Sequence, residues 1–173
     1  NYVQEARAVI ETLGGAAAWH FIGHLQKNKV KYAVRLFDMI QTVDSVELAV
    51  TIDRLASQHG RVMPVLIEVN SGREETKHGA MPENVPDLVR CIAGLPNISI
   101  KGLMTMGPFV EDPERLRPFF RATKQLFDEI RAIGIPGVDM EILSMGMSDS
   151  YRIAVEEGAT MVRIGTLLFG ERS

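Results

Sequence analysis

The sequence has a single cysteine, Cys91, among 173 residues, so no disulfide can form within the chain. Proteins without disulfides are typical of a reducing compartment, and we expect this protein to be cytoplasmic. No apolar run approaches the ~20 residues of a membrane span. The first residues also do not show the pattern of a signal peptide. These absences argue against a disulfide-stabilised secreted fold and predict no membrane partner.

Long runs of one charge are missing as well. Nineteen Lys and Arg residues stand against 22 Asp and Glu residues, which gives a formal net charge of −3. This mixed, slightly acidic balance argues against nucleic acid or an anionic membrane as the main partner. The sequence has no G-x-S-x-G elbow, and Cys91 falls in the middle of a predicted helix. We therefore find no arrangement for nucleophilic catalysis and assign no catalytic residue.

Strand-like and helix-like segments alternate along the chain, which is typical of βαβ units around a parallel sheet. The pattern predicts six strands, at about residues 19–22, 39–42, 64–69, 98–106, 140–144 and 160–169. No linker or repeat interrupts them, so we expect residues 1–173 to form one domain. Two folds remain open. An open doubly wound sheet fits the length, whereas a complete eight-stranded α/β barrel typically needs ~250 residues. However, no Gly-rich dinucleotide fingerprint follows any strand.

Residues 142–170 are the most informative segment, because both predicted strands in it end in small polar residues. Ser144 and Ser148 follow the first strand, and Gly165 and Thr166 end the second. Small residues let a ligand approach the backbone, and free N–H groups and hydroxyls suit an anion such as phosphate. The loops after the last two strands of an α/β barrel are the usual phosphate site. The alternative for Ser148 is a helix N-cap.

Arg163 is predicted on a strand that is otherwise almost entirely apolar. An unpaired buried charge is costly, so this guanidinium needs a partner. The partner could be a strand carboxylate, Glu68 or Glu141, or an acceptor atom of a ligand. Met106 stands at the end of another predicted strand. It could be core filler, or an apolar surface against which a flat ring packs.

Two histidines, His20 and His24, stand four residues apart. This spacing places both on one face only in a helix, whereas the stretch predicts a strand that runs into a loop. We therefore expect no metal site here. Lys77 and His78 belong to the polar loop 71–79, which could border a site or simply be surface.

Five motifs resemble the YggS/PROSC family of pyridoxal 5′-phosphate (PLP) homeostasis proteins. They are NYVQE (1–5), HFIGHLQKNK (20–29), GLMTM (102–106), LSMGMSDS (143–150) and VRIGTLLFG (162–170). They follow one another along the whole chain, which makes the resemblance specific. It implies a (β/α)8 TIM barrel of the alanine racemase N-terminal type, with PLP at the carboxyl ends of the strands. This chain would hold about six of the eight strands.

The resemblance implies seven cofactor-binding residues: Asn1, Met106, Ser144, Ser148, Arg163, Gly165 and Thr166. Arg163 would face the pyridine nitrogen and keep it unprotonated, which weakens the electron sink that PLP catalysis usually uses. Ser148, Gly165 and Thr166 would hold the phosphate, with Ser144 close to it. Met106 would pack against the ring.

The family binds the aldehyde of PLP through a Schiff-base lysine on its first barrel strand, upstream of the motif that matches NYVQE. No lysine of this sequence matches that position. The lysines present are Lys27, Lys29, Lys31, Lys77, Lys101 and Lys124. We therefore expect the sequence to be the N-terminally incomplete part of a longer protein.

Three functions remain to be weighed. The resemblance favours a monomeric, non-catalytic PLP-binding protein that stores the cofactor or delivers it to PLP-dependent apo-enzymes. The second is a fold-type III PLP enzyme, such as an amino-acid racemase or decarboxylase. Such enzymes add a C-terminal β-domain, for which the sequence leaves no room. The third is a phosphate-binding barrel enzyme without PLP, which would use Glu68 and Glu141 as its acid and base.

Overall fold

The structure is a computed structural model that describes residues 2–170; Asn1 and residues 171–173 lie outside the described part. Its sheet has five strands: β1 (His20–Phe21), β2 (Met39–Val43), β3 (Met63–Glu68), β4 (Ile98–Met104) and β5 (Val138–Ser144). All neighbouring strands are parallel, and their order in the sheet is β1-β2-β3-β4-β5. A doubly wound sheet reverses its strand order at a switch point. The doubly wound alternative is therefore wrong, because here the order of the strands in the sheet follows the sequence without a reversal.

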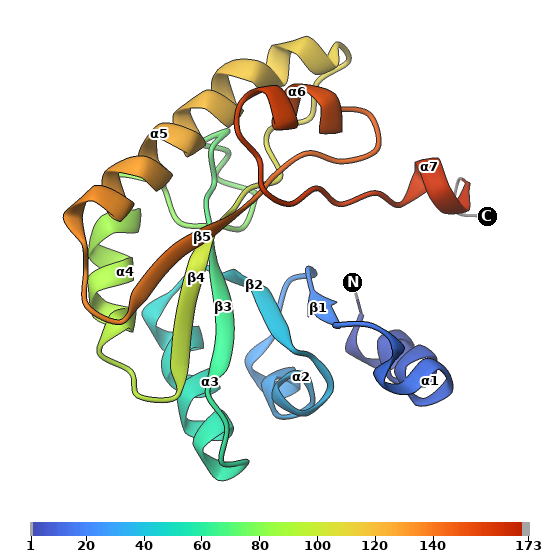
Figure 1. The fold of residues 1–173 in the computed structure, drawn as a ribbon, viewed down its shortest axis with the longest axis vertical. Coiled ribbons are helices and arrows are strands. Elements are labelled where there is room, and N and C mark those ends of the chain that lie inside the picture. Colours follow the sequence, from blue (N-terminus) through green and yellow to red (C-terminus); the bar gives the residue numbers. More distant parts are fainter. Residues whose placement is uncertain (1, 171–173) are drawn as a thin grey trace.

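Seven helices lie within residues 2–170, and those between consecutive strands cover one side of the sheet. The seven are α1 (Val3–Leu13), α2 (Val30–Leu36), α3 (Val46–Gln58), α4 (Val85–Ala93), α5 (Arg117–Ile133), α6 (Tyr151–Glu156) and α7 (Thr166–Phe169). Short 3-10 turns span Gly14–Ala16, Lys27–Lys29, Pro82–Asn84 and Pro113–Leu116. Helices α2 to α5 curve around the outside of the sheet (Figure 1). Helix α1 lies beside α2, and α7 lies apart from the other helices. None of the described helices is long and apolar enough to cross a lipid bilayer.

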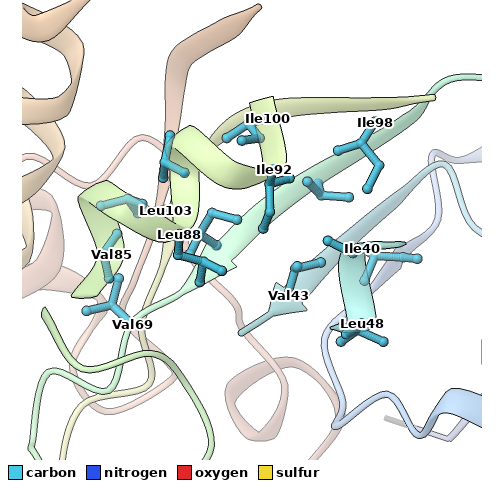
Figure 2. Close-up of a cluster of buried hydrophobic side chains, with 14 of the residues drawn as sticks. Ile40, Val43, Leu48, Val69, Val85, Leu88, Ile92, Ile98, Ile100 and Leu103 are labelled. Atoms are coloured by element: carbon cyan, nitrogen blue, oxygen red, sulfur yellow. The ribbon is translucent and has the colours of Figure 1, made fainter. Parts of the chain in front are cut away.

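The side of the sheet that faces these helices forms the main core. Side chains alternate along a strand, and on β3 the helix-facing positions are Met63, Val65 and Ile67, all fully buried. Figure 2 shows Ile100 and Leu103 of β4 in the same cluster as α4 side chains. Each such fully buried side chain contributes about 1.5–3 kcal/mol of transfer free energy. This face therefore supplies most of the apolar burial.

The other side of the sheet has a different character. Its middle carries a small apolar cluster of Met39, Leu66 and Met104. Buried polar side chains lie nearer the carboxyl ends of the strands. Gln41 and Glu68 are two residues beyond Met39 and Leu66 on β2 and β3, and Ser144 is the last residue of β5. Polar side chains on this side therefore gather at the carboxyl ends of the strands.

The sixth predicted strand, 160–169, is wrong. Met161 makes one isolated parallel bridge to Ser144, and Thr166–Phe169 form the short helix α7. Phe169 is 85% exposed, so the segment is not buried. Periodicity cannot distinguish a short apolar helix from a buried strand, which explains the error. Within residues 2–170, β1 and β5 do not pair, and the described sheet is open.

Candidate functional site

Parallel strands bring all their carboxyl ends to one edge of the sheet, and two cavities open at this edge. The first, about 640 Å³, is lined by the start of α1, the ends of β2 and β3, and the loops that follow β1, β3 and β4. The second, about 1040 Å³, lies between β1 and the segments 147–149 and 161–167. Ile22 and Met106 line both cavities, so the two are neighbours.

The second cavity brings together most of the predicted cofactor residues. Those that line it are Met106, Ser148, Arg163, Gly165 and Thr166. Ser144 is fully buried and lines neither cavity. Asn1 lies outside the described residues. A set of residues spread over more than 60 positions thus converges on one space.

The Arg163 guanidinium is held by the ends of β4 and β5. Its Nη1 donates to Ser144 Oγ at 2.7 Å. Its Nη2 donates to the Thr105 carbonyl at 2.9 Å and contacts Met106 Sδ at 3.3 Å. Its Nε is buried and has no hydrogen-bond partner. The group is therefore fixed in orientation while one N–H remains to be satisfied.

Arg163 makes no ion pair with a described carboxylate, so the ion-pair alternative is wrong. Glu141 is exposed, and Glu68 acts only through its field. Burial lowers the pKa of Arg163 to about 10, and the nearby Glu68 opposes this shift. Burial also raises the pKa of Glu68 to about 7, helped by Asp44 and opposed by Arg163. Arg163 thus stays charged at neutral pH, while Glu68 retains its proton to a much higher pH than an ordinary carboxyl group.

Ser144 belongs to a buried polar chain behind Arg163. Its hydroxyl donates to Gln41 Oε1 at 2.8 Å while it accepts from Arg163. Gln41 Nε2 lies 3.0 Å from His20 Nδ1, and burial lowers the pKa of that imidazole. Ser144 therefore orients Arg163 and does not reach the cavity. Sequence reasoning missed Gln41, although a glutamine within an apolar strand was a usable signal.

Ser148 does not cap α6, as the alternative required, because the N-cap of that helix is Ser150. Instead its Oγ accepts hydrogen bonds from the backbone N–H groups of Gly165 and Leu167, each at 3.2 Å. The site at Gly165 is open: a Cβ added there would meet no atom within 4 Å. The Ser148 hydroxyl and two backbone N–H groups therefore lie beside unfilled space at one side of the second cavity.

The first cavity is bordered by the loop 71–79. Asn70 holds this loop through its side-chain amide, which donates to the Glu74 carbonyl at 2.8 Å. Lys77 and His78 line the cavity together with Glu68. Glu141 lines neither cavity. The described structure therefore does not unite Glu68 and Glu141 as an acid–base pair.

The fold and the site define a parallel α/β domain with two polar cavities at the carboxyl ends of its strands. Comparison with known proteins narrows this class. The family of the alanine racemase N-terminal domain matches residues 1–173. The pyridoxal phosphate homeostasis protein of Aquifex aeolicus (strain VF5) is 48% identical over 173 residues, which cover 99% of this chain and 75% of that protein.

Two solved structures of PipY from Synechococcus elongatus PCC7942 are also similar. The structure without PLP has a TM-score of 0.91 at 35% identity and covers 98% of this chain and 80% of PipY. The structure with PLP bound has a TM-score of 0.87 at 34% identity, with 98% and 79% covered. The chain belongs to the YggS/PROSC family of pyridoxal phosphate homeostasis proteins, with the alanine racemase N-terminal fold. The resemblance drawn from the five motifs is confirmed.

Proposed function

We propose that the protein binds PLP in the second cavity and stores it or delivers it to PLP-dependent apo-enzymes, without catalysing a reaction. The observation that carries this proposal is Arg163 Nε, a buried donor without a partner in the described structure. Leaving a buried donor unsatisfied costs about 1–3 kcal/mol. The pyridine nitrogen of PLP is an acceptor without a proton of its own, and it would satisfy this donor.

The opposite side of the cavity fits the phosphate. Ser148 Oγ accepts hydrogen bonds from the N–H groups of Gly165 and Leu167, which brings these three groups together. Phosphate oxygens accept from such hydroxyl and amide donors. Thr166 adds a further hydroxyl at the same edge. The absence of a Cβ at Gly165 keeps the backbone accessible.

Between these two ends, Met106 offers an apolar surface to the ring. Its sulfur contacts Arg163 Nη2 at 3.3 Å, so the side chain is tied to the same arginine. Ser144 holds that arginine and is itself held by Gln41, which also lines the second cavity. The ring would thus meet a rigid, pre-organised wall. We assign Ser144, which lines neither cavity, an orienting role and no direct contact with PLP.

The same arginine supports storage over catalysis. Bound PLP supplies an amine-reactive aldehyde and a ring that withdraws electrons most strongly when its nitrogen is protonated. Arg163 keeps its own proton, because its pKa of about 10 lies well above neutrality. A donor that does not release its proton leaves the pyridine nitrogen neutral. This weakens the ring as an electron sink and favours a carrier.

We also propose that the lysine that binds the aldehyde lies outside residues 1–173. No described lysine lines the second cavity, whereas Lys29 and Lys77 line the first. The sequential order of β1 to β5 is compatible with part of an α/β barrel, and a complete barrel has eight strands. The remaining strands would close the barrel beside β1 and Met161 and would carry this lysine.

Borohydride reduction of the PLP-loaded full gene product tests the lysine assignment. We expect peptide mass spectrometry to find the reduced cofactor on one lysine outside residues 1–173. The controls are the two lysines of the first cavity, Lys29 and Lys77. Stoichiometric labelling of either one would contradict the assignment.

Arg163→Ala tests the cavity itself. We expect PLP retention after dialysis to fall at least about tenfold, because a hydrogen bond from a charged donor contributes about 1.5–3 kcal/mol. Arg152→Ala is the matched control, since Arg152 is exposed and contacts only Tyr151. Equal retention in the two variants would overturn the proposed site.

A further inference from the structure

Three side chains outside the second cavity converge at the carboxyl ends of β1, β2 and β3. His24 lies in the loop after β1, Asp44 directly follows β2, and His78 lies in the loop after β3. One possible ligand atom from each lies within 4.8 Å of the other two. Because 20 and 34 residues separate them in the sequence, no motif reveals the group.

The three side chains have no other polar partner in the described structure. None of them makes a side-chain hydrogen bond or an ion pair with a described residue, although 11 ion pairs form elsewhere in residues 2–170. His20, by contrast, is engaged by Gln41 and does not face His24. The two histidines that lie together are therefore His24 and His78, from two different loops, and not His20 and His24.

The two imidazoles stack face to face, with ring centroids 3.6 Å apart and planes inclined by 9°. Two charged rings would repel each other at this distance. Parallel rings cannot both direct a lone pair at one ion, so one ring must turn. Both side chains are exposed and free to do so.

We propose that His24, Asp44 and His78 bind a divalent transition-metal ion, with Zn²⁺ the best match to this ligand set. Two imidazole nitrogens and one carboxylate oxygen are ligands that Zn²⁺ takes at about 2.0–2.2 Å. A fourth position would be left for water or for a group that enters the first cavity. This proposal does not depend on PLP binding.

The local charge permits a cation. Lys77 also lines the first cavity, but its ammonium is paired with Glu74 at 2.8 Å. Asp44 provides a carboxylate, and Glu68 is close enough for Asp44 to influence its pKa. An ion at this place would link the loops after β1 and β3, whose imidazoles already stack, to Asp44 at the end of β2. It would fix the loop 71–79 over the first cavity.

Titration of the PLP-free protein with ZnCl₂ tests the site, followed by calorimetry and by NMR of the histidine side chains. We expect one Zn²⁺ per chain, with ring signals of His24 and His78 shifting and those of His20 and His59 unchanged. His24→Ala, His78→Ala and Asp44→Asn should each weaken Zn²⁺ binding at least about tenfold, since each removes one of three ligands.

His59→Ala is the matched control, because His59 is an exposed histidine at the end of α3. Its Zn²⁺ affinity should equal that of the unaltered protein. The proposal would be overturned by absence of binding at micromolar Zn²⁺. It would also be overturned if binding were unchanged in the His24→Ala and His78→Ala variants, or were lost equally in His59→Ala.

Discussion

The two faces of the parallel sheet differ in what their side chains do. Toward α2–α5 the strands present residues such as Ile67 and Leu103, fully buried among apolar neighbours. On the opposite face the apolar cluster of Met39, Leu66 and Met104 gives way to polar groups at the carboxyl ends. One face supplies burial energy, and the other places charge and hydrogen bonds where a ligand can enter.

The two faces also differ in how completely their buried polar groups are paired. Buried polar groups in native proteins are nearly always paired, and Gln41 and Ser144 follow this rule. Arg163 Nε is the exception on the polar face of the described residues. Substitutions on the two faces should therefore have different consequences. Those at close-packed positions and at the buried Glu68 should affect stability, and those at the second cavity should affect PLP binding.

Gly102→Ala should give the largest effect, and it acts at a close-packed position. Gly102 has φ +146°, and an added Cβ would lie 1.8 Å from the Ile142 carbonyl oxygen. This overlap with the β5 backbone cannot relax without separating β4 from β5. We expect a loss of more than about 4 kcal/mol of unfolding free energy in urea denaturation.

The control for this prediction is Gly15→Ala, whose Cβ would meet no atom within 4 Å and whose φ is negative. It should leave the unfolding free energy within about 0.5 kcal/mol of the unaltered protein. If both variants were equally stable, the close approach of β4 and β5 would be incorrect.

Glu68→Gln should give an intermediate effect that depends on pH. The pKa of Glu68 is raised from 4.5 to about 7 in the folded protein. The folded state therefore binds the proton more tightly than the unfolded state, and stability falls as pH rises from 4.5 to 7. Glu68→Gln removes this loss. We expect the variant to exceed the unaltered protein by up to about 3 kcal/mol above pH 8.

At pH 4.5 the two proteins should have nearly the same unfolding free energy, because Glu68 is then neutral in the folded state and only half ionised in the unfolded state. Urea denaturation at pH 4.5 and 8.5 measures the difference. A constant difference between the two pH values would show that Glu68 is not desolvated on this face.

Gly165→Ala should have the smallest effect on stability while affecting binding. The added Cβ meets no protein atom within 4 Å, so we expect a change in unfolding free energy within about 0.5 kcal/mol. The methyl group would occupy space at the proposed phosphate position. PLP retention should therefore fall about tenfold or more. Unchanged retention would place the phosphate elsewhere.

The sequence allowed most elements to be predicted because their periodicity was strong. The strands predicted at 39–42, 64–69 and 140–144 overlap β2, β3 and β5. The strand predicted at 160–169 failed because an apolar run of that length fits a strand or a short helix equally well. Its residues turn outward after the single bridge at Met161.

For the site, resemblance supplied the residues and the structure supplied their relations. Arg163 and Ser148 lie at the second cavity, as their motifs suggested. Ser144 accepts a hydrogen bond from Arg163 and donates one to Gln41. The second contact joins residues more than 100 positions apart in the sequence. The His24, Asp44 and His78 group is also a product of tertiary structure. No local pattern records these long-range contacts.

The most direct test of the central claim is the protonation state of the pyridine nitrogen of bound PLP. PLP labelled with ¹⁵N at the ring can be loaded into the full gene product and observed by NMR at pH 7. If Arg163 Nε donates to that nitrogen, the ¹⁵N shift should be that of an unprotonated, hydrogen-bonded pyridine and should move in Arg163→Ala. A pyridinium shift, or one that Arg163→Ala leaves unchanged, would contradict the account.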